Sequence, residues 1–165
     1  MKVIILLLLF PVNVYSQKIK TEIDKFTNEK RIETGWSSIR PTLSAPLSIK
    51  IRSVGKESVF ITLAGANYGA NVIGNDATAM FLLDDKTTIT ITSTGIQDYE
   101  IGEYGKSYQH QYRITVSDLK LLSVHIITSI RKSDSETYHD FDIEKKNGEK
   151  FRQLVIKFLK EFNNQ

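Results

Sequence analysis

Three histidines, at positions 110, 125 and 139, are the side chains of this chain best suited to acid–base chemistry. A hydrolase needs a serine, a histidine and a carboxylate within reach of one another, and the sequence has no G-x-S-x-G elbow. His110 and His139 occupy inward positions of expected strands, which favours core histidines. His125 faces outward opposite Asp142, without a candidate nucleophile beside it. We therefore assign no catalytic residue.

The sequence contains no complete metal-binding or phosphate-binding motif. Asp140, Asp142 and Glu144 have the spacing of a calcium loop, but Lys145 stands where that loop requires glycine. The chain has no cysteine and no H-E-x-x-H motif. The glycine-containing segment 64–76 lacks the ending of a phosphate-binding loop. The sequence thus predicts no cofactor and no metal site.

The strand segments that carry the histidines show a period of two. Residues 108–116 alternate, and 124–131 and 136–144 form the best-defined hairpin. A two-residue loop at Ser133 and Asp134 would place Ile126 opposite Phe141 and His125 opposite Asp142. A longer loop of the same parity would keep the same side chains on each face.

Further expected strands precede this hairpin. They cover 47–54, 58–63, 78–83 and 87–94, with a polar hairpin at 18–34, an irregular link from Gly35 to Pro46 and one helical turn at 119–122. Two segments, 64–76 and 95–107, are expected to be long loops and the places to look for function.

Two side-chain sets favour binding over catalysis. Thr88, Thr90, Thr92 and Thr94 share one strand face, as is typical of an exposed strand, although such a row can also read a regular surface. The aromatic residues Trp36, Tyr99, Tyr104, Tyr108 and Tyr112 could form a patch that contacts a glycan or a protein. By parity, Tyr108 and Tyr112 belong to the core instead.

The end of the chain predicts an amphipathic helix at 148–162. Its apolar stripe contains Phe151, Leu154, Val155, Phe158, Leu159 and Phe162. Nearly everything before it reads as strand, so we expect an α+β fold. A curved antiparallel sheet of seven to nine strands, or a small barrel, would pack on the helix, with Val124, Ile126, Phe141 and Ile143 as the facing surface.

The start of the chain predicts a secretory signal. Lys2 precedes an apolar run from Val3 to Phe10, and Val14-Tyr15-Ser16 fits a cleavage site. The run is shorter than the about 20 residues that span a bilayer; an uncleaved anchor is the alternative. Cleavage would leave 17–165 as a single domain without a membrane anchor, in the periplasm or outside the cell. The chain would fold without disulfides.

Charge argues against nucleic acid as a partner. The 22 basic and 19 acidic residues give a net charge of +3, and the basic residues form no dense run with aromatic residues. The sequence sets no oligomeric state.

Several segments are similar to small secreted β-rich proteins of Bacteroidetes that have no assigned activity. They are Ser16-Gln17, Ile23-Asp24-Lys25-Phe26-Thr27, Leu82-Leu83-Asp84-Asp85, Val116-Ser117-Asp118-Leu119 and 127–131. The resemblance implies an exported β-rich domain and transfers no catalytic residue. We expect a non-catalytic exported binding or accessory domain with a protein or glycan partner in the cell envelope. The alternative is a hydrolase or metal-dependent enzyme that uses His125 or His139 with Asp140 or Asp142.

Overall fold

The computed structural model describes residues 19–102, 105–134 and 137–164, which form one antiparallel sheet with two helices. The strands are β1 (Ile19–Ile23), β2 (Lys30–Thr34), β3 (Ser37–Arg40), β4 (Leu47–Val54), β5 (Ser58–Ala66), β6 (Thr78–Leu83), β7 (Thr88–Gly102), β8 (Gly105–Ile114), β9 (Ile127–Ser133) and β10 (Tyr138–Asp142); the helices are α1 (Val116–Val124) and α2 (Lys145–Asn163). The expected α+β class is confirmed, with ten strands rather than seven to nine.

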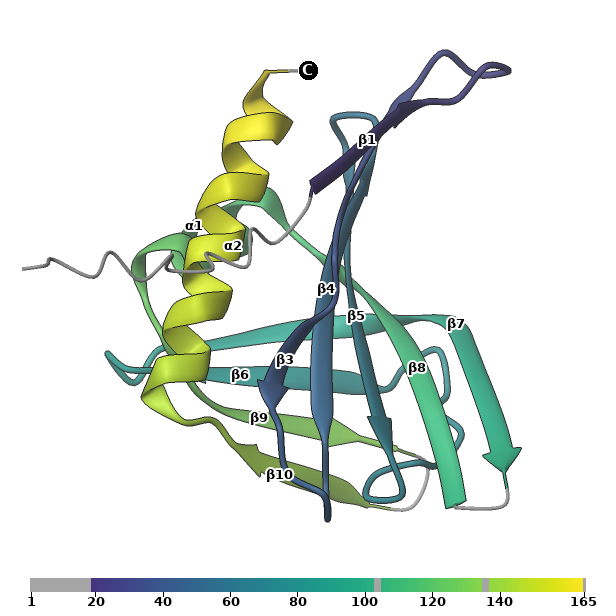
Figure 1. Cartoon of the computed structure of the whole chain (residues 1–165), viewed down its shortest axis with the longest axis vertical. Coiled ribbons are helices and arrows are strands. Elements are labelled where there is room, and N and C mark those ends of the chain that lie inside the picture. The colour runs from purple at the N-terminus through teal and green to yellow at the C-terminus, as the bar shows by residue number, and fades with distance from the viewer. Residues whose placement is uncertain (1–18, 103–104, 135–136, 165) are drawn as a thin grey trace, which may run out of the picture.

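The sheet is strongly bent and stays open. Its order is β1-β2-β4-β5-β8-β7-β6-β9-β10, and β3 pairs with β4 beyond the end of β2. Figure 1 shows β4, β5 and β8 crossing steeply over the layer of β6, β7, β9 and β10. The 15-residue β7 belongs to both layers, because its first part pairs with β6 and its last part with β8. The register shifts between Ser93 and Gln97, where Gly95 has φ +73°, and such a bulge bends a strand.

Alternating side chains fill the space between the two layers. Every second residue of β4 is buried, as a sheet with one solvated face requires. Ile49, Ile61 and Phe81 are fully buried and come from both layers. One hydrophobic core therefore runs between the layers and under α2.

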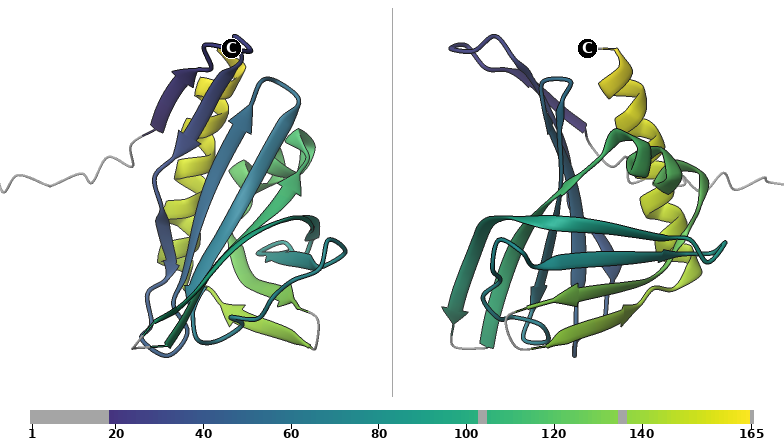
Figure 2. Two further views of the ribbon diagram at one scale, coloured as in Figure 1. Left: turned by 90° about the vertical axis from the view of Figure 1, so that its right-hand side faces the viewer. Right: turned by 180° about the vertical axis from the view of Figure 1, so that it is seen from behind.

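Helix α2 lies where the two halves of the sheet diverge, with β2, β3 and β4 on one side and β9 on the other (Figures 1 and 2). All six residues of the predicted stripe are buried, which confirms the amphipathic reading. The helix begins three residues earlier than expected, at Lys145. Its first turn lies so close to the sheet that a Cβ on Gly148 would come within 2.5 Å of Ile126 Cγ2.

Helix α1 is longer than the single turn that was expected. Thr115 caps it by accepting a hydrogen bond from the Asp118 amide at 3.0 Å. The helix runs on to Val124, which is 64 % exposed, so the expectation that Val124 faces α2 from a strand is wrong. None of the described helices has the length and apolar character needed to cross a membrane.

Three further expectations need correction. Residues 95–107 are mostly strand, because β7 continues beyond its bulge and pairs Tyr99 with Tyr108. The link before Pro46 contains β3, where Ser37 and Ile39 alternate into the core. The last hairpin turns at 134–137 rather than at Ser133 and Asp134, so Ile130 lies opposite Phe141 and Arg131 opposite Asp140. Ile130 and Phe141 are buried as their parity predicted, whereas Ile127 is buried instead of Ile126 at the start of β9, where the pairing with β6 shifts register.

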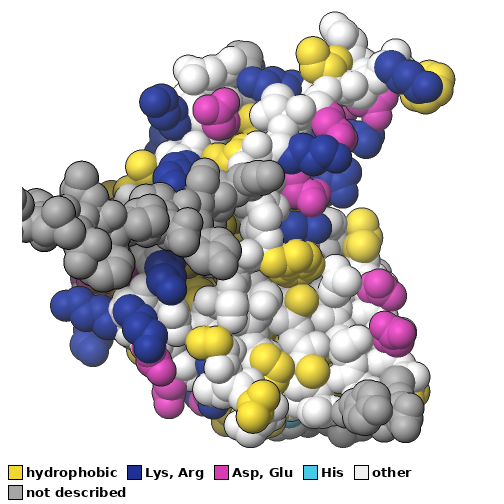
Figure 3. Space-filling model, viewed as in Figure 1, with side chains coloured by type: hydrophobic (Ala, Val, Ile, Leu, Met, Phe, Trp, Pro, Cys, Tyr) yellow, Lys and Arg dark blue, Asp and Glu magenta, His cyan; other side chains and the backbone are white. Residues whose placement is uncertain are grey.

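Charged side chains of both signs lie next to one another on the hairpin of β1 and β2, at the upper right of Figure 3. Lys20 pairs with Glu22, and Arg31 with Asp24. The same hairpin exposes Ile23 and Phe26. The hairpin thus carries a mixed surface and no field of a single sign.

Candidate functional site

A lysine is buried inside the sheet where β8, β9 and the segment 67–77 meet. The Lys132 side chain is 0 % exposed. Its ammonium donates to the carbonyl oxygen of Gly69 and lies 3.1 Å from Nδ1 of His110. It also lies 4.4 Å from the centroid of the Tyr108 ring. The ammonium thus has two hydrogen-bond partners and one aromatic face beside it, and all three are neutral groups.

Burial shifts the titration of this cluster. Loss of hydration lowers the pKa of Lys132 to about 8, against a smaller opposing effect of Asp134. Burial, together with the positive charge of Lys132, lowers the pKa of His110 to about 3. His110 is therefore neutral at pH 7. We assign its proton to Nε2, because Nδ1 faces the lysine donor.

Three polar atoms of this interior have no hydrogen-bond partner within the described part of the chain. They are Nε2 of His110 and the hydroxyl oxygens of Tyr108 and Tyr112. Burial raises the pKa of both phenols. Both tyrosines are core residues, as their parity predicted.

Segment 67–77 closes this cluster from outside. Ala70 and Ile73 are buried, and the Asn71 amide donates to Asp134 at 2.9 Å. Nε2 of His139 lies 2.7 Å from the same carboxylate, and the His139 ring meets the Tyr68 ring edge-on at 4.8 Å. Lys132 and the His139–Asp134 pair therefore have a structural role, because they hold segment 67–77 against the sheet.

The burial of Lys132 could have been predicted from the sequence. It follows Ile130 by two residues on the inward face of its strand, and the expected strand ended one residue before it. His139 does pair with an aspartate, but with Asp134 rather than with Asp140 or Asp142. Asp140 instead binds Arg131.

His125 lies away from the strand position predicted for it, because it caps the C-terminus of α1. Its two ring nitrogens are 3.3 Å from Asp84 and 3.4 Å from Asp85, and not opposite Asp142. These three side chains could offer a metal ion one nitrogen and two oxygens within 4.8 Å of one another. Asp84 also accepts from the Ile126 amide and Asp85 from that of Thr87. These contacts join the turn after β6 to the end of α1, and we assign no metal to the three side chains.

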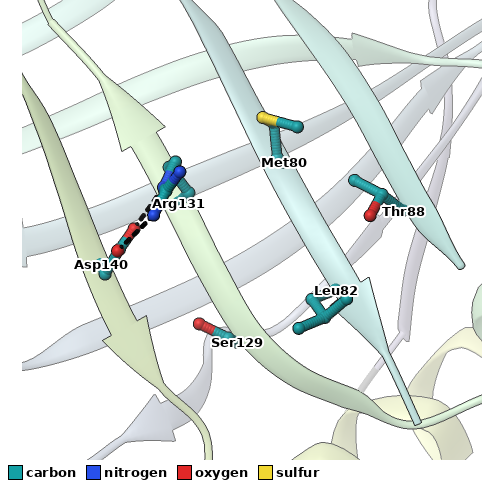
Figure 4. A pocket seen from close by; sticks show the side chains of 6 residues that line it. All are labelled: Met80, Leu82, Thr88, Ser129, Arg131 and Asp140. Atoms are coloured by element: carbon teal, nitrogen blue, oxygen red, sulfur yellow. Dashed lines mark hydrogen bonds and ion pairs between the residues drawn. The ribbon is translucent and has the colours of Figure 1, made fainter. Parts of the chain in front are cut away.

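The outer face of β6, β7, β9 and β10 contains a shallow depression of about 190 Å³ (Figure 4). Strand alternation puts its lining on the solvent side, opposite the core. The lining residues are Met80, Leu82, Thr88, Ser129, Arg131 and Asp140. Met80 and Leu82 form an apolar floor, and the other four side chains supply polar groups.

A planar ion pair stands at one side of this depression. Arg131 donates through Nε and Nη2 to the two oxygens of Asp140, each at 2.6 Å. These hydrogen bonds raise the pKa of Arg131 and lower the pKa of Asp140. The Arg131 guanidinium also lies 4.4 Å from the centroid of the Tyr138 ring, which is 59 % exposed. The pair is thereby held flat while remaining open to solvent.

The predicted binding residues are only partly brought together. Thr88, Thr90 and Thr92 are exposed in a row beside Leu82, Met80 and Thr78, whereas Thr94 bonds to Gln111. The predicted aromatic patch does not form from Trp36, Tyr99, Tyr108 and Tyr112, two of which are core residues; Tyr104 lies outside the described residues. Tyr138, which the sequence analysis did not single out, is the aromatic side chain beside Arg131.

No protein-family model, curated protein or solved structure matches this chain.

Proposed function

We propose that the protein is a non-catalytic exported binding domain that holds a glycan on the outer face of β6, β7, β9 and β10. The observation that supports this most is the depression over Met80 and Leu82, with the flat Arg131–Asp140 pair at its side. Sugars present an apolar C–H face and a rim of hydroxyl groups. An apolar floor with charged donors and acceptors beside it matches both features.

The surrounding side chains extend this match. The exposed Tyr138 ring offers a flat amphipathic surface for a sugar ring. The hydroxyl groups of Thr88, Thr90 and Ser129 can donate to or accept from sugar hydroxyls. Because the ion pair is locally neutral, the face favours an uncharged polysaccharide over a strongly acidic one.

The alternative of a hydrolase or metal-dependent enzyme has less support. His139 is held by Asp134 and lies against Tyr68. His125 contacts the carboxylates of Asp84 and Asp85. Both ring nitrogens of His125 thus face carboxylates, whereas His139 has a carboxylate at Nε2.

Export is part of the same proposal and rests on residues 1–16, which lie outside the described residues. N-terminal sequencing of the protein from its native host should give Gln17 as the first residue. An N-terminus at residue 1 or 2 would contradict cleavage.

A glycan array tests the binding proposal. The purified mature chain should retain a limited set of neutral oligosaccharides. Tyr138→Ala and Asp140→Asn should each weaken the best of them at least about tenfold, which corresponds to about 1.4 kcal/mol. Lys157→Ala, on the exposed side of α2, is the matched control and should bind as the unmodified chain does.

Two results would overturn the proposal. One is glycan binding that survives both substitutions unchanged. The other is an array without binding, together with capture of a defined envelope protein that Tyr138→Ala abolishes, which would assign the same face to a protein partner.

A further inference from the structure

A second depression lies at the start of α2, where Asp142 follows Asp140 of the outer-face site by two residues along β10. Its volume is about 200 Å³, and it opens between the end of β3 and the connection from β10 to α2. Arg40, Thr42, Asp142, Glu144 and Asn147 contribute to its lining. The start of α2 is the lower end of that helix in Figure 1.

One side of this depression provides hydrogen-bond donors. Helix α2 has 19 residues, and its N-cap Glu144 makes no side-chain capping bond. The Asn147 and Gly148 amides both donate to the Glu144 carbonyl oxygen, so the first turn offers the amides of Lys145 and Lys146 and a partial positive charge. Asn147 adds a side chain that is only 3 % exposed and whose Nδ2 has no partner among the described residues. A buried amide without a partner costs free energy unless a ligand or water meets it.

Opposite charges line the same space without meeting. Within the described ranges, Arg40 and Asp142 do not lie within 4.0 Å of any oppositely charged group. Arg40 donates through Nη1 to Thr42 at 2.9 Å and to the Ala45 carbonyl, which leaves its other nitrogens available. Glu144 is neutralised by Lys146 at 2.7 Å. The neighbourhood thus has a cation held by hydrogen bonds, an exposed carboxylate and no net charge.

We propose that this depression binds a small zwitterion, namely a free α-amino acid. Its carboxylate would face Arg40, Asn147 and the first turn of α2, while its ammonium group would face Asp142. Each charge of the ligand then meets an opposite charge of the protein. A simple anion fits less well, because the carboxylate of Asp142 repels it. The available volume is enough for a small side chain.

Titration calorimetry with the mature chain tests this proposal. L-alanine, L-serine and L-glutamine are the probes. The N-acetyl form, which lacks the ammonium charge, and the amide form, which lacks the carboxylate, are the matched ligands. At least one free amino acid should bind with a Kd of about 1 mM or tighter. Each blocked form should bind at least tenfold more weakly.

Exposed Asp142 allows a substitution that leaves the core intact. Asp142→Asn should weaken the free amino acid about tenfold and leave the N-acetyl form unchanged. Arg40→Gln should weaken the free amino acid about tenfold and leave the amide form, which lacks the carboxylate, unchanged. Glu161→Gln on α2 is the control. Absence of saturable binding by all probes, or equal binding of free and blocked forms, would overturn the proposal without touching the glycan site.

Discussion

Replacing Lys132 by methionine should change how the stability of the protein depends on pH. Burial holds the pKa of this amine at about 8 in the folded chain, against 10.5 for an ordinary lysine. The unfolded chain therefore keeps its proton at pH values where the folded chain has lost it. Under that linkage the folded state gains stability as pH rises from about 8 toward 10.5, and the total is about 3 kcal/mol.

Urea unfolding of both proteins between pH 7 and pH 9.5 measures this effect. The difference in unfolding free energy, unmodified chain minus Lys132→Met, should rise by about 2 kcal/mol across that range. The raised pKa values of Tyr108 and Tyr112 act in the opposite direction, but they are present in both proteins and largely cancel in the difference. If the difference in unfolding free energy stays constant with pH, the Lys132 amine is hydrated in the folded chain. That result would contradict its burial against Gly69, His110 and Tyr108.

Three other expected outcomes follow from the packing. Phe158→Ala empties the centre of the α2 stripe and should cost about 3–5 kcal/mol in chemical denaturation; an unchanged midpoint would contradict the core placement. Gly148→Ala should destabilise, although alanine favours helices, because its Cβ would meet Ile126 Cγ2 at 2.5 Å; a rise in melting temperature would refute the close contact. His110 has its pKa lowered to about 3, so the folded state loses stability as pH falls below 6.5. Between pH 7 and pH 4.5 the unfolding free energy, measured with urea, should fall by about 3 kcal/mol less in His110→Gln than in the unmodified chain. An equal decrease in both proteins would contradict this.

Side-chain periodicity was enough to predict the helix and the buried faces of most strands. The α2 stripe is read at a period near 3.6 and the strands at a period of two, and both follow from local backbone geometry. Parity also explains why Phe141 was placed correctly although its partner was not. The hairpin turns two residues later than predicted, which shifts each cross-strand partner by four positions and keeps Phe141 on the same face.

The features that were missed depend on contacts distant in sequence. Gly95 looked like part of a loop, but it marks the bulge at which β7 leaves one layer for the other. His125 was assigned to a strand, and its carboxylate partners follow from the end of α1 next to the Asp84–Asp85 turn. Lys132 lies one residue beyond the strand expected at 124–131, and its burial depends on partners from distant segments of the fold.

Chemical-shift mapping tests the proposed glycan site most directly. The backbone amides of the mature chain are followed by nuclear magnetic resonance while a retained neutral oligosaccharide is added. The largest shifts should cluster on the outer face at Met80, Leu82, Arg131 and Asp140. Saturable shifts confined to the segment 67–77 or to the start of α2, with the outer face unchanged, would contradict the assignment of the glycan site.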